Sequence, residues 1–195
     1  MYTLEKHTNY IYQYHNFVPD EHCDRIVNLV ESSKSYKTQD ISLKRNRSRN
    51  NDCLSVTSRR DEPEMAEADA LIHHFYAQVH SLYLMQNKLL SYYGNPEGKY
   101  LNNLRSSYIY RWYNPGEYYD WHTDYALEKW FVVSYLLYLN DEFEGGDTLF
   151  LNDRLRVKAK KGSIVCFPCD LQTVHKGAII KSGTKKVIWS CFEKY

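Results

Sequence analysis

The hydrophobic period of this sequence changes close to residue 104, and this change constrains the fold more than any other feature. Before it, apolar residues recur every three or four positions. After it, they alternate or form short runs, namely SSYIYRWY, WFVVSYLLYL, DTLFL, LRVKA, SIVCF and KKVIWSCF. Such runs predict β-strands. The breaks between them, such as Asn114-Pro115-Gly116, carry turn residues and have no room for a crossover helix, so we expect antiparallel pairing.

Helices are predicted in the first half of the chain. Apolar residues at helical spacing follow Pro19 up to Val30, and a second, longer series runs from about Glu64 to Tyr92, where Gly94-Asn95-Pro96 would stop it. Residues 38–60 are polar and basic, and we expect a loop with one strand there. The pattern predicts an α+β protein in which two sheets pack face to face or close into a barrel, with the helices against an outer face.

Length and charge exclude several classes of protein. A chain of 195 residues is expected to form one domain. With 25 basic and 24 acidic residues the net charge is +1, which gives no indication of a nucleic-acid or membrane partner. No apolar run is long enough to span a membrane, and the first residues carry no export signal, so we expect a cytoplasmic protein. The five cysteines are odd in number and widely spread, which favours free thiols.

One His-x-Asp triplet lies in the strand-rich half, at His122 and Asp124. A similar triplet, His22-Cys23-Asp24, falls in the first predicted helix, where residues i and i+2 point in different directions. On a strand they project from the same face and can share a metal ion. His175 is the other histidine of the strand-rich half, and two imidazoles with one carboxylate form the facial triad of non-haem Fe(II) oxygenases. The alternative is that His122 is an ordinary strand histidine.

Further spacings complete a recognisable pattern. Tyr113, Gly116, Tyr119, His122 and Asp124 lie in a Tyr-x-x-Gly-x-x-Tyr-x-x-His-x-Asp arrangement, which is followed by EGGDT at 144–148, KGSIVCF at 161–167, His175, and GTK ending at Lys185. From about residue 104 to 193 the chain resembles the prolyl 4-hydroxylase-like branch of the Fe(II)/2-oxoglutarate-dependent dioxygenases. The first half matches only loosely, through its helices.

The resemblance implies a fold and a division of the chain. It implies a double-stranded β-helix, or jelly-roll, core with N-terminal supporting helices. Residues 1–195 would form a single Fe(II)/2-oxoglutarate dioxygenase domain. In it, 1–100 would be a helical support and substrate-loop region, and 101–195 the jelly-roll core with the metal site.

The resemblance also implies roles for individual residues. His122, Asp124 and His175 would be the catalytic Fe(II) ligands, and Lys185 would bind the distal carboxylate of 2-oxoglutarate. A buried carboxylate needs such a cation, and on a strand Lys185 and Lys186 face opposite ways. Tyr113 and Thr148 match positions that hydrogen-bond 2-oxoglutarate, although packing explains a tyrosine or a β-branched residue equally well. Substrate-pocket candidates are Trp189, Arg111 and Tyr119.

The implied activity is hydroxylation of an unactivated C–H bond, coupled to decarboxylation of 2-oxoglutarate to succinate and CO₂. The cofactors would be Fe(II), 2-oxoglutarate and O₂, with L-ascorbate as a reductant, and the implied substrate is a proline in a peptide or protein. Alternatives are hydroxylation of a free amino acid or other small molecule, and a non-catalytic metal-binding β-barrel.

Nucleic acid is not expected as a partner. The alkylation-repair branch of the superfamily carries arginines after its distal histidine, whereas the segment from His175 to Tyr195 has none. The basic stretch 44–60 holds few aromatic residues for stacking bases, so we expect a solvated loop, with a lid over the substrate as the alternative.

Overall fold

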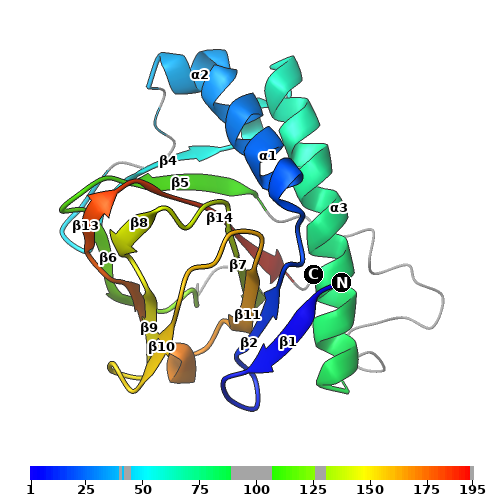
Figure 1. Ribbon diagram of the computed structural model, residues 1–195, viewed down its shortest axis with the longest axis vertical. Helices are drawn as coiled ribbons and strands as arrows, with labels where there is room; N and C mark the ends of the chain where they lie inside the picture. The colour runs from blue at the N-terminus through cyan, green and yellow to red at the C-terminus, as the bar shows by residue number, and fades with distance from the viewer. Residues whose placement is uncertain (40, 42–44, 89–106, 126–130, 194–195) are drawn as a thin grey trace.

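Two antiparallel sheets form the centre of the protein in its computed structural model, which describes residues 1–195 except 40, 42–44, 89–106, 126–130 and 194–195 (Figure 1). Over the described residues the larger sheet has the strand order β1-β2-β11-β7-β14-β5-β4, and the smaller has the order β10-β9-β12-β6-β3. A separate pair joins β13 to β8.

The strands of the larger sheet are β1 (Thr3–Lys6), β2 (Tyr12–His15), β4 (Asp52–Ser55), β5 (Ile109–Tyr113), β7 (Phe131–Tyr138), β11 (Ile164–Pro168) and β14 (Lys185–Glu193). Those of the smaller sheet are β3 (Arg49–Asn50), β6 (Tyr118–His122), β9 (Thr148–Phe150), β10 (Leu155–Val157) and β12 (His175–Gly177). The separate pair is β8 (Phe143–Gly145) and β13 (Ile180–Gly183).

Helices cover the outer face of the larger sheet. α1 (Asp20–Ser32) and α3 (Pro63–Gln86) lie side by side there, and α2 (Lys34–Lys37) follows α1 at one end (Figure 1). The alternation along β7 shows how the sheet serves two cores. Val133, Tyr135 and Leu137 pack with the helices, whereas Leu136 and Tyr138 belong to a second core between the two sheets. This second core surrounds the candidate site.

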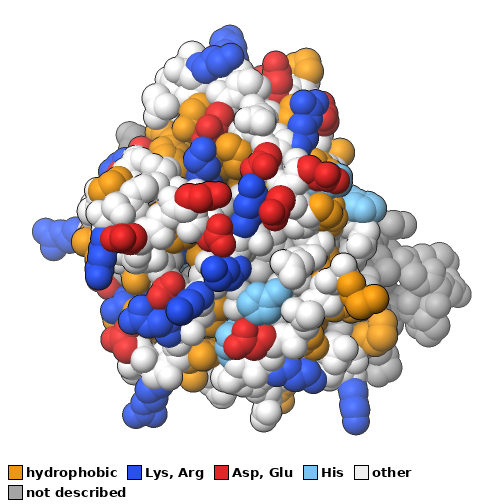
Figure 2. Space-filling view, in the orientation of Figure 1, with side chains coloured by type: hydrophobic (Ala, Val, Ile, Leu, Met, Phe, Trp, Pro, Cys, Tyr) orange, Lys and Arg blue, Asp and Glu red, His pale blue; other side chains and the backbone are white. Residues whose placement is uncertain are grey.

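The predicted fold class is confirmed: helices support a jelly-roll of antiparallel strands. The six apolar runs of the second half each contain a strand. No helix in the described part of the chain is long and apolar enough to cross a membrane. Basic and acidic side chains lie interspersed over the face shown in Figure 2, in keeping with the small net charge.

The first half departs from the expectation in its strands. β1 and β2 form a hairpin that adds to the edge of the larger sheet beside β11, and no sequence pattern predicted it. The described part of residues 38–60 holds two strands and not the one expected: β4 pairs with β5 of the larger sheet, and β3 pairs with β6 of the smaller sheet. The first half therefore contributes strands to both sheets as well as the supporting helices.

The long helix is also shorter than predicted. It begins at Pro63 and ends at Gln86, not at Tyr92, because Lys88 adopts the left-handed conformation (φ 56°) and the side chain of Asn87 donates to the Tyr83 carbonyl. The predicted stop at Gly94-Asn95-Pro96 lies outside the described residues.

Candidate active site

His122 and His175 face one another across two neighbouring strands of the smaller sheet. They are Cα partners in the antiparallel pairing of β6 with β12, and their ring centroids lie 4.2 Å apart. Directly opposed residues of an antiparallel pair project from the same face. Two histidines 53 positions apart in the sequence are thereby placed side by side, as a shared metal ligand set requires.

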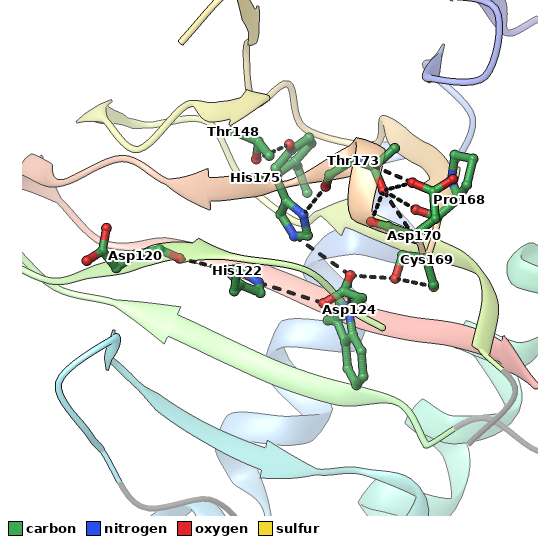
Figure 3. Close-up of polar contacts among 12 residues, drawn as sticks. Asp120, His122, Asp124, Thr148, Pro168, Cys169, Asp170, Thr173 and His175 are labelled. Atoms are coloured by element: carbon green, nitrogen blue, oxygen red, sulfur yellow. Dashed lines mark hydrogen bonds and ion pairs between the residues drawn. The ribbon is translucent and has the colours of Figure 1, made fainter. Parts of the chain in front are cut away.

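Backbone carbonyls fix which nitrogen each imidazole presents. Nδ1 of His122 donates to the Asp120 carbonyl at 2.7 Å, and Nδ1 of His175 donates to the Thr173 carbonyl at 3.0 Å (Figure 3). A carbonyl only accepts, so Nδ1 carries the proton in both rings and Nε2 keeps its lone pair. The His122 ring also stacks on Tyr119 with centroids 3.6 Å apart. Both Nε2 atoms are therefore free to ligate and are held in place.

Asp124 completes the group two residues after the end of β6. Its Oδ1 lies 3.7 Å from Nε2 of His122, and its Oδ2 lies 3.7 Å from Nε2 of His175 (Figure 3). Oδ2 accepts hydrogen bonds from Ser134 Oγ and from Trp189 Nε1, the latter at 3.1 Å. Burial by itself raises the pKa of Asp124, but the two imidazoles and these donors outweigh it, so the pKa lies below its ordinary value. Asp124 is thus held as a carboxylate.

The three side chains fit a divalent metal ion. Their ligand atoms all lie within 4.8 Å of one another, and the donor set is two imidazole nitrogens and one carboxylate. Burial, together with the neighbouring His175, lowers the pKa of His122 to about 4. At pH 7 the His122 imidazole is therefore uncharged, which metal ligation requires. The metal-ligand roles themselves stay a prediction that this geometry supports.

Lys185 lies in the same cavity, on β14. Its side chain is 4% exposed, Nζ donates to the Gly146 carbonyl, and Nζ lies 5.6 Å and 5.2 Å from the ring centroids of Tyr113 and Tyr138. Burial lowers the pKa of Lys185 to about 8. The expected alternation holds, since Lys186 lies on the other face of the sheet and pairs with Glu31 of α1 at 2.7 Å. Lys186 is therefore part of the helix-covered face, not free in solvent.

Hydroxyl groups surround the lysine. Thr148 is buried at the start of β9 and bonds the hydroxyl of Tyr138 at 2.7 Å, while burial raises the pKa of Tyr113 to about 12. Sequence reasoning named Tyr113 and Thr148 but missed Tyr138 and Ser134. Both missed residues lie on the inward face of β7, and the alternation of that strand was the available signal. It did not show which face points to the site.

The remaining predicted residues form one wall of this cavity. Arg111 of β5 is buried, and its Cζ lies 5.1 Å from the ring centroid of Tyr119 and 5.1 Å from that of Trp189. The cavity is lined by Arg111, Tyr113, Tyr119, His122, Leu136, Tyr138, Thr148, His175, Gly177, Lys185, Val187 and Trp189. Every predicted site residue except Asp124 lines it, and Asp124 contacts it through Trp189 and the histidines.

The basic stretch 44–60 lies near this sheet but does not line the cavity. Arg45 pairs with Asp52 and with Glu117, and β3 pairs with β6. Residue 44 lies outside the described residues, and the interpretation of this stretch as a solvated loop or a lid stays a prediction.

Comparison with known proteins agrees with this geometry. Residues 108–193 match the family model of the 2OG-Fe(II) oxygenase superfamily. No curated protein matches the sequence significantly.

Solved structures of similar fold include prolyl hydroxylases. A viral collagen prolyl hydroxylase from Paramecium bursaria Chlorella virus-1, solved with 2-oxoglutarate, is 20% identical with a TM-score of 0.68, over 95% of this chain and 97% of that one. A Pseudomonas putida prolyl-4-hydroxylase is 18% identical with a TM-score of 0.68, over 95% and 92%. A Trichoplax adhaerens prolyl hydroxylase, solved with a hypoxia inducible factor peptide fragment, is 17% identical with a TM-score of 0.72, over 95% and 84%.

These findings confirm the resemblance to the prolyl 4-hydroxylase-like branch and the predicted enzyme class, an Fe(II)/2-oxoglutarate-dependent dioxygenase. The match to the family model covers residues 108–193, the part of the chain that holds every predicted site residue.

Proposed function

We propose that this protein hydroxylates an unactivated C–H bond of a proline in a peptide or protein and couples this to decarboxylation of 2-oxoglutarate to succinate and CO₂. The observation that carries the proposal is the cavity itself. It is lined by the two histidines of a His-Asp-His ligand set, with Asp124 directly beside them, and by a buried lysine. A ligand set alone fits many metal proteins, whereas the added buried cation fits an anionic co-substrate.

The metal would be held by Nε2 of His122, Nε2 of His175 and the carboxylate of Asp124. Fe(II) bound there, with 2-oxoglutarate and O₂, supplies the oxidising power for breaking the C–H bond. The protein orients these groups. Backbone carbonyls hold the two imidazoles, and Ser134 and Trp189 hold the carboxylate by donating to Oδ2.

The co-substrate would extend from the metal ligands toward Lys185. Its distal carboxylate would take the ammonium group of Lys185 as a partner, with the hydroxyls of Tyr113 and Thr148 as further hydrogen-bond donors. An isolated buried ammonium is costly, which is why the pKa of Lys185 is lowered to about 8. An arriving carboxylate removes that cost and favours the charged lysine.

The prolyl substrate is supported by the structural relatives, which are prolyl hydroxylases by title, at identities that show the fold alone. Trp189, Arg111 and Tyr119 would form the substrate side of the cavity. A free amino acid or another small molecule is the alternative substrate. L-Ascorbate as a reductant and a cytoplasmic location belong to the same proposal and rest on the family resemblance and the sequence.

An anaerobic titration with Fe(II) and then 2-oxoglutarate tests the cofactor assignment without knowledge of the substrate. We expect the weak visible charge-transfer band of a metal-chelated 2-oxo acid. The band should be lost in Asp124→Ala and kept in Asp120→Ala, because the Asp120 side chain is exposed and only its carbonyl holds His122. Metal binding without the band would instead favour a non-catalytic metal-binding barrel.

The lysine assignment has a matched control on the same strand. Lys185→Ala should raise the 2-oxoglutarate concentration needed for the band strongly, whereas Lys186→Ala, on the opposite face, should not. The reverse result would place the wrong lysine in the cavity. Succinate formation that depends on added prolyl peptides then tests the substrate class.

A further inference from the structure

Arg111 is a second buried cation in the cavity, and the proposed function places it on the substrate side without naming a group that it binds. The residue is 5% exposed, and its Nε and Nη1 atoms are buried with no hydrogen-bond partner. Among the residues that the structure describes, no carboxylate forms an ion pair with it, whereas Arg45, Arg60 and Arg156 each pair with an aspartate or glutamate. Buried donors of a guanidinium are normally satisfied, so unpaired ones indicate a missing partner.

We propose that Arg111 binds a carboxylate of the substrate. This inference rests on the proposed function, since it assumes that 2-oxoglutarate occupies the other cation. The co-substrate has two carboxylates, of which one belongs at the metal and the other at Lys185. Arg111 is then the cation left for a third carboxylate. Its unsatisfied Nε and Nη1 lie on opposite edges of the guanidinium, and each offers one charge-assisted N–H donor to such a group.

The position of Arg111 places this carboxylate near the reacting centre. Its guanidinium lies between the rings of Tyr119 and Trp189, with Cζ 5.1 Å from each centroid. Tyr119 stacks directly on His122, and Trp189 donates to Asp124. Arg111 is thus separated by one aromatic ring from each of two predicted metal ligands. An anion bound at Arg111 therefore lies close to the metal position.

Lys185 and Arg111 lie at different positions along the paired strands β14 and β5. In the pairing of β14 with β5, Lys185 lies opposite Tyr113, and Val187 lies opposite Arg111. Lys185 lies against Tyr138 and Gly146, and Arg111 lies against the rings of Tyr119 and Trp189. Tyr113 lies between the two cations: Lys185 Nζ is 5.6 Å from its ring centroid, and its hydroxyl is hydrogen-bonded with Arg111. Two separate anion positions on one cavity wall fit two ligands better than one.

The substrate class follows from this separation. A substrate bound through Arg111 carries a free carboxylate within a few bonds of the carbon to be hydroxylated. An internal proline of a peptide has no such group, because its carbonyl is an amide. Within the prolyl class, the structure assigns a proline with its own carboxylate, either at the C-terminus of a peptide or as the free amino acid.

Matched ligands test this on the full-length protein. N-acetyl-L-proline and N-acetyl-L-prolinamide differ only in the carboxylate, and their affinities are measured by anaerobic calorimetry in the presence of Fe(II) and 2-oxoglutarate. We expect the acid to bind the wild-type protein about tenfold or more tightly than the amide, as one charge-assisted pair implies. In Arg111→Met this ratio should fall to about one, and Arg111→Lys should keep part of it. L-Proline as a third ligand separates the free amino acid from a C-terminal residue.

The ratio of the acid and amide affinities within one preparation does not depend on the fraction of folded protein. It can therefore be measured even for a destabilised variant. Equal binding of acid and amide to the wild-type protein, or no binding of either, would overturn the proposal. So would an acid preference that survives in Arg111→Met, or an Arg111→Met variant that loses only the 2-oxoglutarate charge-transfer band, which would make Arg111 a co-substrate residue. Absence of the band in the wild-type protein is a separate result, which contradicts the proposed function.

Discussion

Replacement of Lys185 by methionine is expected to make the ligand-free protein more stable while removing its ability to bind 2-oxoglutarate. The lysine is buried, and burial lowers its pKa from 10.5 to about 8. At pH 7 the ammonium form therefore costs the folded state about 3 kcal/mol relative to the unfolded chain. The Gly146 carbonyl and the ring faces of Tyr113 and Tyr138 give back part of this, about 1 kcal/mol. Methionine fills similar space without charge, so we expect a gain of about 1 to 3 kcal/mol.

The pH dependence distinguishes this explanation from ordinary repacking. The pKa of Lys185 is lower in the folded than in the unfolded state, so its destabilising effect is complete below about pH 8 and is lost as the pH rises toward 10.5. The advantage of Lys185→Met over the wild-type protein should therefore shrink by about 2 kcal/mol between pH 7 and pH 10. Urea unfolding of both proteins at the two pH values measures the difference.

Ligand binding should reverse the order of stability. With metal present at saturation, 2-oxoglutarate at about 100 times its dissociation constant should stabilise the wild-type protein by about 3 kcal/mol further, and should add nothing to the stability of metal-loaded Lys185→Met. Lys186→Met is the control, and loss of its ion pair with Glu31 should cost about 0.5 kcal/mol. A Lys185→Met protein that is less stable than wild type at pH 7, by an amount that does not vary with pH, would refute the reasoning.

Three further predictions concern the ligands and their support. His175→Ala should abolish Fe(II) binding in calorimetry, whereas His22→Ala, on α1, should not; iron-dependent succinate production by His175→Ala would contradict the ligand assignment. Trp189→Phe removes the donor to Asp124 Oδ2 and should weaken Fe(II) binding about tenfold, and unchanged affinity would show that Ser134 alone suffices. Gly145→Ala should cost about 2 to 3 kcal/mol in urea unfolding, because its Cβ would lie 2.3 Å from the backbone oxygen of Ile179 in a residue with φ +79°. Gly116→Ala meets no atom within 4 Å and should cost about 1 kcal/mol, and equal losses would argue against the steric explanation.

The strand-rich half of the fold could be predicted because its period and turn residues are local signals. The apolar runs of β7 and β14 and the turn at Asn114-Pro115-Gly116 needed no knowledge of the rest of the chain. The hairpin of β1 and β2 could not be predicted in this way. Its stability comes from pairing with β11, about 150 residues later, and from contacts such as Gln13 with Ser163.

The candidate site was partly visible in the sequence for a similar reason. Spacing showed that His122 and Asp124 can share a face, and His175 was the other histidine of the strand-rich half. The resemblance supported these three and pointed to Lys185. The sequence could not show that His122 and His175 are directly opposed, because strand register depends on long-range pairing. The roles of Tyr138 and Ser134 also depend on which face of β7 points inward, and the run WFVVSYLLYL is apolar on both faces.

The carbonyl-anchored imidazoles have a consequence for how the protein handles metal. In many small metalloproteins the ion creates the site by folding the chain around it. Here the tautomers and ring orientations of His122 and His175 are set by Asp120 and Thr173 of the chain itself, and Asp124 is set by Ser134 and Trp189. The metal-free protein is therefore expected to be folded and able to bind metal. Removal of the metal with a chelator should be reversible, and different divalent ions should bind to the same unchanged ligand geometry.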